Sequence, residues 1–469
     1  MATTLATPGV YIEEKSSFGS SVVPVQTSIP AFIGYTAMAS RGSKDLTNVP
    51  TRISSLGQFE ELFGGAPSTK FNIESNDTTV GFSLSFVEES RFLLHSSMRL
   101  FYANGGADCY IVSVGGYDEK IDAAKLNDPK GGGLTALEKF LEPTIVVIPD
   151  AILLDENDCY SLQAAMLQHC GYKLKNRFAI LDVYEGAKER TFDEDDAVDK
   201  FRNGVGSNFL QWGASYYPFL NTTIVSKSEI DFTRIANLDG LTEVLSKEVA
   251  QNLEADNITA ARAEGITAEI DKIADTTDAD GVNSLNSTLT VISPSLNLIL
   301  AEISEKLNVL PPSPAMAGAY TMVDSQASVA QSPANISLGS VIAPLVNINN
   351  DNQEELNLPL NGKAVNAIRT FQGKGVLVWG ARTLEGNSKD YRYISVRRTM
   401  TFLEQSIKAA AEAFVFAPNN ATTWSTLRAT VSSFLANQWQ SGLLAGQSAD
   451  DAFSVDIGLG ATMTPNDIL

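Results

Sequence analysis

Two short, uninterrupted apolar segments constrain the fold of this chain most. Residues 145–148 are Ile-Val-Val-Ile, and residues 178–181 are Phe-Ala-Ile-Leu. Strands that are apolar on both faces are typical of parallel sheets covered on both faces. A helical pattern over residues 158–170 separates the two segments. The order strand, helix, strand therefore predicts an α/β layer, with a sheet buried between helices.

Further strand and helix patterns flank this layer. Strands are predicted at residues 26–35, 109–114, 214–220, 375–380 and 452–457, and helices at residues 50–64, 82–103, 395–414 and 422–444. Residues 226–310 differ, because two amphipathic stripes there flank a polar, acidic stretch. We interpret that segment as a helical insertion at the surface.

Length and composition are those of a folded, multidomain chain. Its 469 residues allow two or three domains, and 44% of them are hydrophobic. No apolar run reaches the about 18 residues that a membrane span requires, so we expect no direct membrane insertion. We also see no secretory signal at the N-terminus. The three cysteines are an odd number without metal-ligand spacing, which indicates buried thiols in a reducing cytosol.

Charge is distributed unevenly along the chain. The formal net charge of −21 argues against binding of nucleic acid, which needs a basic surface. Residues 363–428, however, contain ten Lys or Arg and only four Asp or Glu. This basic section predicts self-association or an acidic protein partner. The alternative is a solvated face with local ion pairs.

A strand pattern near the N-terminus has no partner close to it in the sequence. Residues 7–14 alternate apolar and polar side chains after a Pro-Gly pair, and a polar run at 15–21 follows. Such a strand needs a sheet to join, either as an edge of the chain's own sheet or in another copy. When extended, the first ~28 residues could span at most ~90 Å, far enough to reach a neighbour.

No pattern of residues indicates an active site. His95 and His169 each lie in an amphipathic helical pattern, where a structural role is expected. The glycines near 105 and 373 lack the spacing of dinucleotide or phosphate loops. Residues 193–196 lack the Gly and terminal Glu of a calcium loop, so we expect a solvated acidic turn there. We therefore predict no catalytic residue, no metal site and no cofactor. An enzyme would need a clustered nucleophile and base.

Several segments, taken in order, resemble the contractile tail sheath proteins, which form the outer cylinder of phage tails and of phage-tail-like injection particles. The matching segments are TPGVYIEE (7–14), SIPAFIGYT (28–36), ISSLGQFEELFGG (53–65), FYANGGADCYIVSV (101–114), IVVIPD (145–150), RFAILDV (177–183), GASYYPFL (213–220), PANISL (333–338), LNGKAVNAIRTFQGKGVLVWGART (360–383), YRYISVRRTMTFLEQSIKAAAEAFVFAPNN (391–420), TTW (422–424) and GLLAGQSADDAFSVDIG (442–458). Within the family, the chain looks most like sheath subunits of extracellular contractile injection systems.

The resemblance implies a multidomain α/β (mixed α+β) sheath fold. An N-terminal arm over residues 1–24 would precede an inner domain formed by residues 25–115 and 361–469. Residues 116–360 would form an inserted outer α/β domain that carries the helical insertion at 226–310. Family members usually continue past the segment equivalent to 462–469 into a final strand, so either the sequence is trimmed or the C-terminal arm is missing here.

The resemblance also implies a structural role without enzymatic activity. Sheath subunits stack as six-subunit rings around an inner tube, and a metastable extended lattice contracts to drive the tube through a target envelope. The implied partners are further copies, the inner tube protein, and baseplate and terminator or cap proteins. Assembly in the bacterial cytoplasm and release as a tail-like particle are expected. The alternatives are the sheath of a true phage virion, or a non-contractile self-assembling structural protein.

Two sets of residues are candidates for contacts between subunits. By resemblance, Val10, Tyr11, Ile12, Glu13 and Glu14 would form the arm strand that inserts into a neighbour's sheet. The helix at 422–440 would lie near the tube. In the basic section, Lys374, Arg397, Arg398 and Arg428 are the candidates for electrostatic contact with a neighbouring subunit or the tube.

Overall fold

The computed structural model of the chain describes residues 22–75 and 81–468. Contacts divide the chain into two compact units. Residues 26–398 form the first, here called the sheet unit. The second, here called the terminal unit, consists of residues up to Val25 together with residues from Thr399 onward. The predicted arm residues Val10, Tyr11, Ile12, Glu13 and Glu14 lie outside the described residues.

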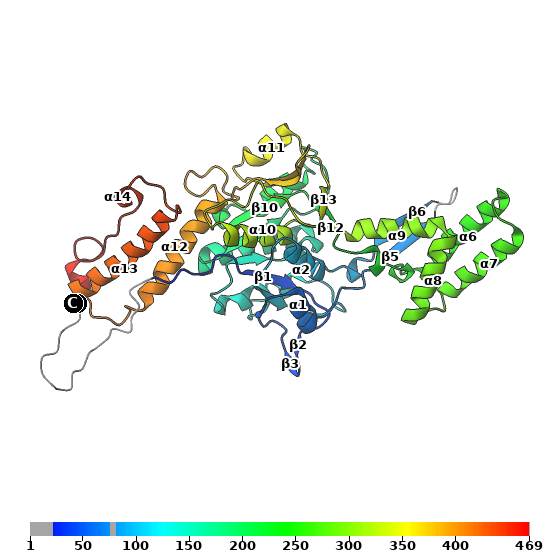
Figure 1. The fold of residues 1–469 in the computed structure, drawn as a ribbon, viewed down its shortest axis with the longest axis horizontal. Coiled ribbons are helices and arrows are strands. Elements are labelled where there is room, and N and C mark those ends of the chain that lie inside the picture. Colours follow the sequence, from blue (N-terminus) through cyan, green and yellow to red (C-terminus); the bar gives the residue numbers. More distant parts are fainter. Residues whose placement is uncertain (1–21, 76–80, 469) are drawn as a thin grey trace, which may run out of the picture. The chain divides into compact units, whose positions relative to one another are not determined.

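An eight-stranded sheet forms the centre of the sheet unit (Figure 1). Its strands, in spatial order, are β15 (Gly375–Trp379), β14 (Asn366–Phe371), β10 (Gly213–Tyr217), β9 (Phe178–Asp182), β8 (Ile145–Val147), β1 (Pro30–Gly34), β7 (Cys109–Ser113) and β4 (Thr51–Ile53). The six inner strands are parallel, whereas the edge strands β4 and β15 run antiparallel to their neighbours. The mixed α/β class predicted from the apolar segments is thus confirmed.

Helices cover both faces of this sheet, as the continuous apolar strands require. In β1, Phe32 packs toward one layer, whereas Ala31 and Ile33 pack toward the other. The Phe32 layer contains α1 (Leu56–Phe63), α2 (Leu94–Ala103) and α10 (Ser313–Gln326). The opposite layer contains α3 (Ala123–Leu126), α4 (Glu156–Gln168), α5 (Ala197–Gly204) and α11 (Asn350–Asn357).

A second core lies in the predicted helical insertion, which we call the helical module. It contains α6 (Leu238–Glu254), α7 (Ala260–Ile270), α8 (Ala279–Ile292) and α9 (Pro294–Leu307), together with the hairpin strands β5 (Phe71–Ser75) and β6 (Phe82–Phe86). Phe71, Ile73 and Leu84 of the hairpin pack against apolar residues of the helices. The module is therefore built from two segments that lie more than 140 residues apart.

The prediction of a helix over residues 82–103 is wrong for its first part. Residues 82–86 form β6, and the helix α2 begins only at Leu94. The sequence Phe-Ser-Leu-Ser-Phe alternates with a period of two, and pairing with β5 fixes that alternation as a strand. Residues 50–64 likewise contain the short strand β4 before the helix α1.

Smaller strands complete the sheet unit. They are β2 (Ser40–Arg41) paired with β3 (Lys44–Asp45), and a three-stranded sheet of β12 (Val309–Leu310), β11 (Leu220–Thr222) and β13 (Val341–Pro344). The predicted domain boundary after residue 115 falls between β7 and α3, and the large sheet extends across it. The division into an arm, an inner domain and an outer domain stays a prediction.

The terminal unit is helical. The helix α12 (Ile394–Glu412) begins in the sheet unit and continues into the terminal unit, where α13 (Ala421–Gln440) and the short α14 (Ala449–Ala452) follow. Leu403, Val431, Phe434 and Leu435 form its core with Val22. Both long helices occur where the apolar patterns predicted them.

The strand predicted at residues 452–457 does not form among the described residues. The helix α14 ends at Ala452, and residues 453–457 follow without helix or strand structure. Their side chains still alternate as in a strand, because Phe453 and Val455 pack on the core of the terminal unit, whereas Ser454 and Asp456 are exposed. The local pattern is strand-like, but a strand also needs a paired neighbour.

Candidate functional site

Two buried aspartates lie at the carboxyl ends of neighbouring strands and cap two helices of one layer. Asp150 follows β8, and its carboxylate accepts hydrogen bonds from the backbone N–H groups of Leu93 (2.7 Å) and Tyr35 (3.1 Å). Asp182 ends β9 and accepts hydrogen bonds from the backbone N–H (2.8 Å) and the hydroxyl of Ser313. The N-cap residues of α2 and α10 make no side-chain cap of their own. The two aspartates therefore satisfy N–H groups that each helix start would leave unpaired.

Both carboxyl groups are strongly perturbed by their surroundings. Burial raises the pKa of Asp150 to about 6, although hydrogen bonds from Leu93 and Tyr35 oppose the rise. Burial raises the pKa of Asp182 to about 7, against the opposing effect of Ser313. Such shifts often mark catalytic groups, but here each carboxylate is engaged by backbone groups of its own fold.

Asp150 also fills the place where an open parallel sheet usually binds a ligand. The chain leaves β1 toward β7 and leaves β8 toward β9, so that β1 and β8 flank the topological switch point. A Cβ atom added to Gly34, at the end of β1, would lie 2.5 Å from a carboxylate oxygen of Asp150. Asp150 therefore lies directly against the end of β1, near the place where an enzyme of this architecture would hold its substrate.

The histidines and cysteines are buried structural residues. Burial lowers the pKa of His169 to about 3, with a further contribution from Arg177, whose guanidinium lies 3.1 Å from the ring nitrogen Nε2. Burial also lowers the pKa of His95, which packs beside Phe59. Burial raises the pKa of the Cys109 and Cys170 thiols to about 12. None of these groups is poised as a base or thiolate nucleophile at neutral pH.

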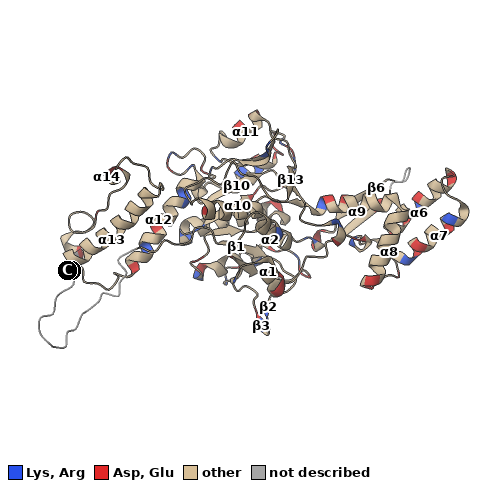
Figure 2. Cartoon of the chain, viewed as in Figure 1, with Lys and Arg blue, Asp and Glu red and all other residues tan. Residues whose placement is uncertain are grey.

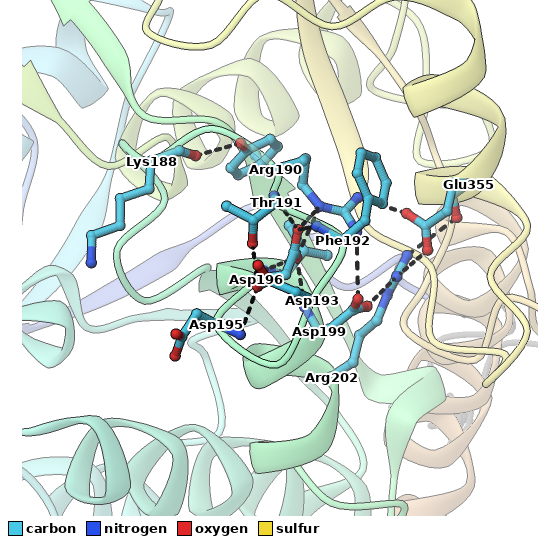
Figure 3. Close-up of polar contacts among 12 residues, drawn as sticks. Lys188, Arg190, Thr191, Phe192, Asp193, Asp195, Asp196, Asp199, Arg202 and Glu355 are labelled. Atoms are coloured by element: carbon cyan, nitrogen blue, oxygen red, sulfur yellow. Dashed lines mark hydrogen bonds and ion pairs between the residues drawn. The ribbon is translucent and has the colours of Figure 1, made fainter.

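The acidic run at residues 193–196 belongs to an ion-pair cluster (Figure 3). Asp196 is fully buried, caps α5, and accepts two hydrogen bonds from Nε of Arg190, at 2.9 and 2.8 Å. Arg190 also pairs with Glu355 of α11 (2.6 Å), and Glu355 in turn pairs with Arg202 of α5. The prediction of a solvated turn holds for Asp195 but is wrong for Asp196, because Arg190 offsets the cost of burying that carboxylate.

Within residues 22–75 and 81–468, no three His, Cys, Asp or Glu side chains are grouped so as to hold a metal ion. The same residues include no helix both long and apolar enough to cross a membrane.

Of the four predicted electrostatic contact residues, two are exposed. Lys374 lies in the turn between β14 and β15, and Arg428 lies on α13, where it donates a hydrogen bond to the carbonyl of Ile457 (2.9 Å). Trp424, Arg428 and Ile457 also line a shallow hollow of about 430 Å³ on α13. Both residues are accessible in the isolated chain, and their contact with a neighbour stays a prediction.

The other two, Arg397 and Arg398, are buried within the sheet unit. The Arg397 guanidinium lies over the rings of Trp212 (4.3 Å) and Tyr391 (4.5 Å). The Arg398 guanidinium forms a bidentate ion pair with Asp324, at 2.9 and 2.6 Å. In the isolated chain, both side chains are therefore engaged internally rather than exposed to a partner. Nothing in the local sequence distinguishes them from surface arginines, since their partners lie far away along the chain.

Comparison with known proteins identifies one matching family for the C-terminal part of the chain. The phage tail sheath C-terminal domain matches residues 387–460, which include α12 to α14 and the extended segment 453–457. No curated protein matches the sequence significantly.

Solved structures match over almost the whole chain. The contracted helical sheath of the anti-feeding prophage shares 26% identity, with a TM-score of 0.59 over 99% of this chain and 92% of that one. The contracted sheath complex of the extracellular contractile injection system PVC shares 26% identity, with a TM-score of 0.57 over 99% and 91% of the two chains. The contracted anti-feeding prophage baseplate includes a chain of the same fold, with 23% identity and a TM-score of 0.62 over 100% and 92%.

The matched proteins are structural components of contractile sheaths, not enzymes. Residues 387–460 match the phage tail sheath C-terminal domain, and the whole chain is similar to the sheath proteins of contractile injection systems.

Proposed function

We propose that this protein is the sheath subunit of a contractile injection particle, stacked as six-subunit rings around an inner tube. The observation that carries the proposal is the match to two contracted sheaths over 99% of the chain. Contraction of the sheath would drive the tube through a target envelope. The inner tube protein, a baseplate and a terminator or cap protein would be its partners, and a similar chain occurs in a baseplate.

The energy for this movement would be stored in the extended lattice. Each additional 100 Å² of apolar surface buried between subunits on contraction contributes at most about 2.5 kcal/mol. The cost of immobilising side chains reduces that figure. Even a small gain for each subunit adds up over many subunits, so no nucleotide needs to be hydrolysed.

Neighbouring subunits would be linked by strand addition, which keeps them connected while their domains rotate. Residues 10–14 would supply the added strand. Residues 453–457 are our candidate acceptor, because the N–H groups of residues 454–457 make no backbone hydrogen bond to any described residue. The alternating burial of this segment leaves Ser454 and Asp456 exposed at the surface of the terminal unit.

Two variants test the strand addition. Deletion of residues 1–20 should leave a folded subunit that forms no long cylinders under the electron microscope. Asp456→Pro should act in the same way, because proline lacks the N–H group that a paired strand donates, and the exposed Asp456 side chain contributes nothing to the core. Asp456→Ala is the matched control and should assemble normally, since it keeps the main-chain N–H group. Long cylinders from both test variants would contradict the proposed link.

The exposed basic residues would contribute electrostatic contacts to this lattice. Residues 226–310 contain 15 Asp or Glu and six Lys or Arg, and the ribbon in Figure 2 marks acidic positions on α7 and α8. Lys374→Glu should shorten or abolish cylinders without unfolding the exposed turn, whereas Lys374→Arg should preserve them. Cylinders of normal length from Lys374→Glu would rule out this contact.

Assembly would take place in the bacterial cytoplasm, and the particle would then be released. The match to the sheath of an extracellular contractile injection system favours such a released particle over a phage virion.

A further inference from the structure

The chain crosses between its two units at two points, and both lie beside one side chain. The sheet unit begins at Gln26 and ends at Arg398. Nη2 of Arg398 donates a hydrogen bond of 3.0 Å to the carbonyl of Thr27, one residue after the first crossing. Arg398 itself is the last residue before the second crossing. One guanidinium therefore binds both ends of the sheet unit to each other.

The segment that contains Thr27 is hydrogen-bonded to the central sheet. The Thr27 carbonyl also accepts a hydrogen bond from Oγ1 of Thr144 (2.8 Å), and Ile29 N–H donates to the same hydroxyl (2.8 Å). Thr144 directly precedes β8, and Ile29 directly precedes β1. The segment 27–29 is thus fastened to the start of two inner strands before the chain leaves the unit.

Asp324, the ion-pair partner of Arg398, belongs to α10. Asp324 lies in the last turn of α10, and its side chain is 3% exposed, against 5% for Arg398. The first residue of α10, Ser313, is held by Asp182 at the end of β9. Both ends of this helix are therefore fixed, one to the sheet and the other to the root of α12.

The stability of the helices alone does not explain this ion pair. A carboxylate in the last turn of a helix is opposed by the helix dipole, and burying two charges is costly unless their geometry is good. Burial disfavours the charge on Arg398, yet Asp324 outweighs that effect and raises the pKa of the guanidinium. The ring of Tyr320, 4.8 Å away, covers the guanidinium. The pair is buried, and the guanidinium is bonded on several sides.

We propose that Arg398 is a positioning residue that clamps the two chain crossings to β8 and α10. This role rests on the proposed sheath function. When a neighbouring subunit pulls on the terminal segments, the clamp would transmit that force to the sheet. Without the clamp, such a pull would loosen residues 26–29 and the first turn of α12 before it moved the sheet.

Hydrogen exchange of the full-length protein tests the clamp without any assembly. Arg398→Lys keeps the charge but lacks the planar fork that bonds both Asp324 oxygens and the Thr27 carbonyl. Exchange of peptides covering residues 26–29 and 394–398 should speed up by about tenfold or more, whereas β9 and β10 should not change. Asp324→Asn should have the same pattern. Unchanged exchange of residues 26–29 in both variants would overturn the clamp.

Arg392→Lys is the matched control. Arg392 lies in the same region and stacks on Tyr393 (5.5 Å), but no bond from it to residues 26–29 is present among the described contacts. Hydrogen exchange at residues 26–29 of the Arg392→Lys variant should equal that of the wild type. If Arg392→Lys loosens residues 26–29 as much as Arg398→Lys does, the effect is general destabilisation and the clamp is wrong.

Assembled particles test the load-bearing role separately. If the wild type forms cylinders, Arg398→Lys should also form them but should contract completely in a smaller fraction of particles than Arg392→Lys. Complete contraction of Arg398→Lys particles, despite faster exchange at residues 26–29, would overturn the transmission of load. Absence of cylinders from the wild type would count against the proposed function, whereas the exchange result would still decide on the clamp.

Discussion

Asp182, at the end of β9, binds both the backbone N–H and the hydroxyl of Ser313, the first residue of α10. The two residues are 131 positions apart in the sequence. Asp150 has the same relationship to the start of α2, and α2 packs against α10 on the same layer. Carboxylates at the carboxyl ends of the inner strands β8 and β9 therefore fix where two packed helices begin.

This relationship predicts the effect of removing the Ser313 hydroxyl. Ser313→Ala should lower the free energy of unfolding by about 1–3 kcal/mol, because the buried Asp182 carboxylate loses one of its two hydrogen-bond donors. Urea unfolding followed by circular dichroism measures the change. Ser325→Ala, at the exposed other end of α10, is the control and should leave the midpoint unchanged. Equal midpoints for the two variants would contradict the capping role.

The raised pKa values predict a specific dependence of stability on pH. The pKa of Asp182 is about 7 in the folded chain, against an ordinary value of 3.8, so the folded state binds this proton more tightly than the unfolded state. Stability from this group is therefore greatest below pH 4 and declines as the pH rises toward 7. Each pH unit in that window costs about 1.4 kcal/mol at most.

Asp182→Asn removes the titration while keeping a polar side chain in place. The difference in unfolding free energy between wild type and Asp182→Asn should shift in favour of the wild type when the pH falls from 8 to 5. Parallel urea titrations at several pH values measure this difference. A constant difference over that range would show that Asp182 does not hold a raised pKa.

The ion-pair cluster predicts a large effect of Arg190 on stability. Arg190→Met would leave the buried Asp196 without its ion-pair partner, and loss of one partner of a buried pair costs about 3–5 kcal/mol. Thermal or urea unfolding would measure the loss. Lys200→Met, which removes an exposed ion pair with Asp195 nearby, should have no measurable effect. Comparable losses in the two variants would mean that burial does not distinguish the pairs.

The helical module predicts that a hairpin residue stabilises helices more than 160 positions away in the sequence. Ile73 is 1% exposed in the core of the module, so Ile73→Ala should cost about 2–5 kcal/mol. Hydrogen exchange should become faster in α6 as well as in β5. Val291→Ala, on the exposed side of α8, should change neither quantity. If hydrogen exchange in Ile73→Ala becomes faster only in the hairpin, the hairpin does not stabilise the helices of the module.

Much of the fold could be predicted from local patterns, because β8 and β9 are continuous apolar runs and α12 and α13 have a helical periodicity, which tertiary contacts reinforce. The helix prediction is wrong for β6 because the alternation of this strand spans only five residues. Residues 453–457 illustrate the opposite case, since a strand-like pattern has no paired neighbour among the described residues.

The charged residues were harder to place from sequence. Lys374 and Arg398 are both positively charged and belong to the same basic section. Lys374 is exposed, whereas the Arg398 side chain is buried beside Asp324, with 5% of its surface exposed. The difference depends on a partner 74 positions away. Likewise, no local pattern shows that Asp150 and Asp182 cap helices, because each cap joins segments far apart in the chain.

The central claim is that copies of this chain form a sleeve that shortens, and electron microscopy of particles before and after a contraction stimulus tests it most directly. The account predicts hollow, six-fold cylinders that become shorter and wider while each subunit keeps its sheet and helical layers. Cylinders of fixed length, or a protein that forms no cylinders with its tube partner, would contradict it.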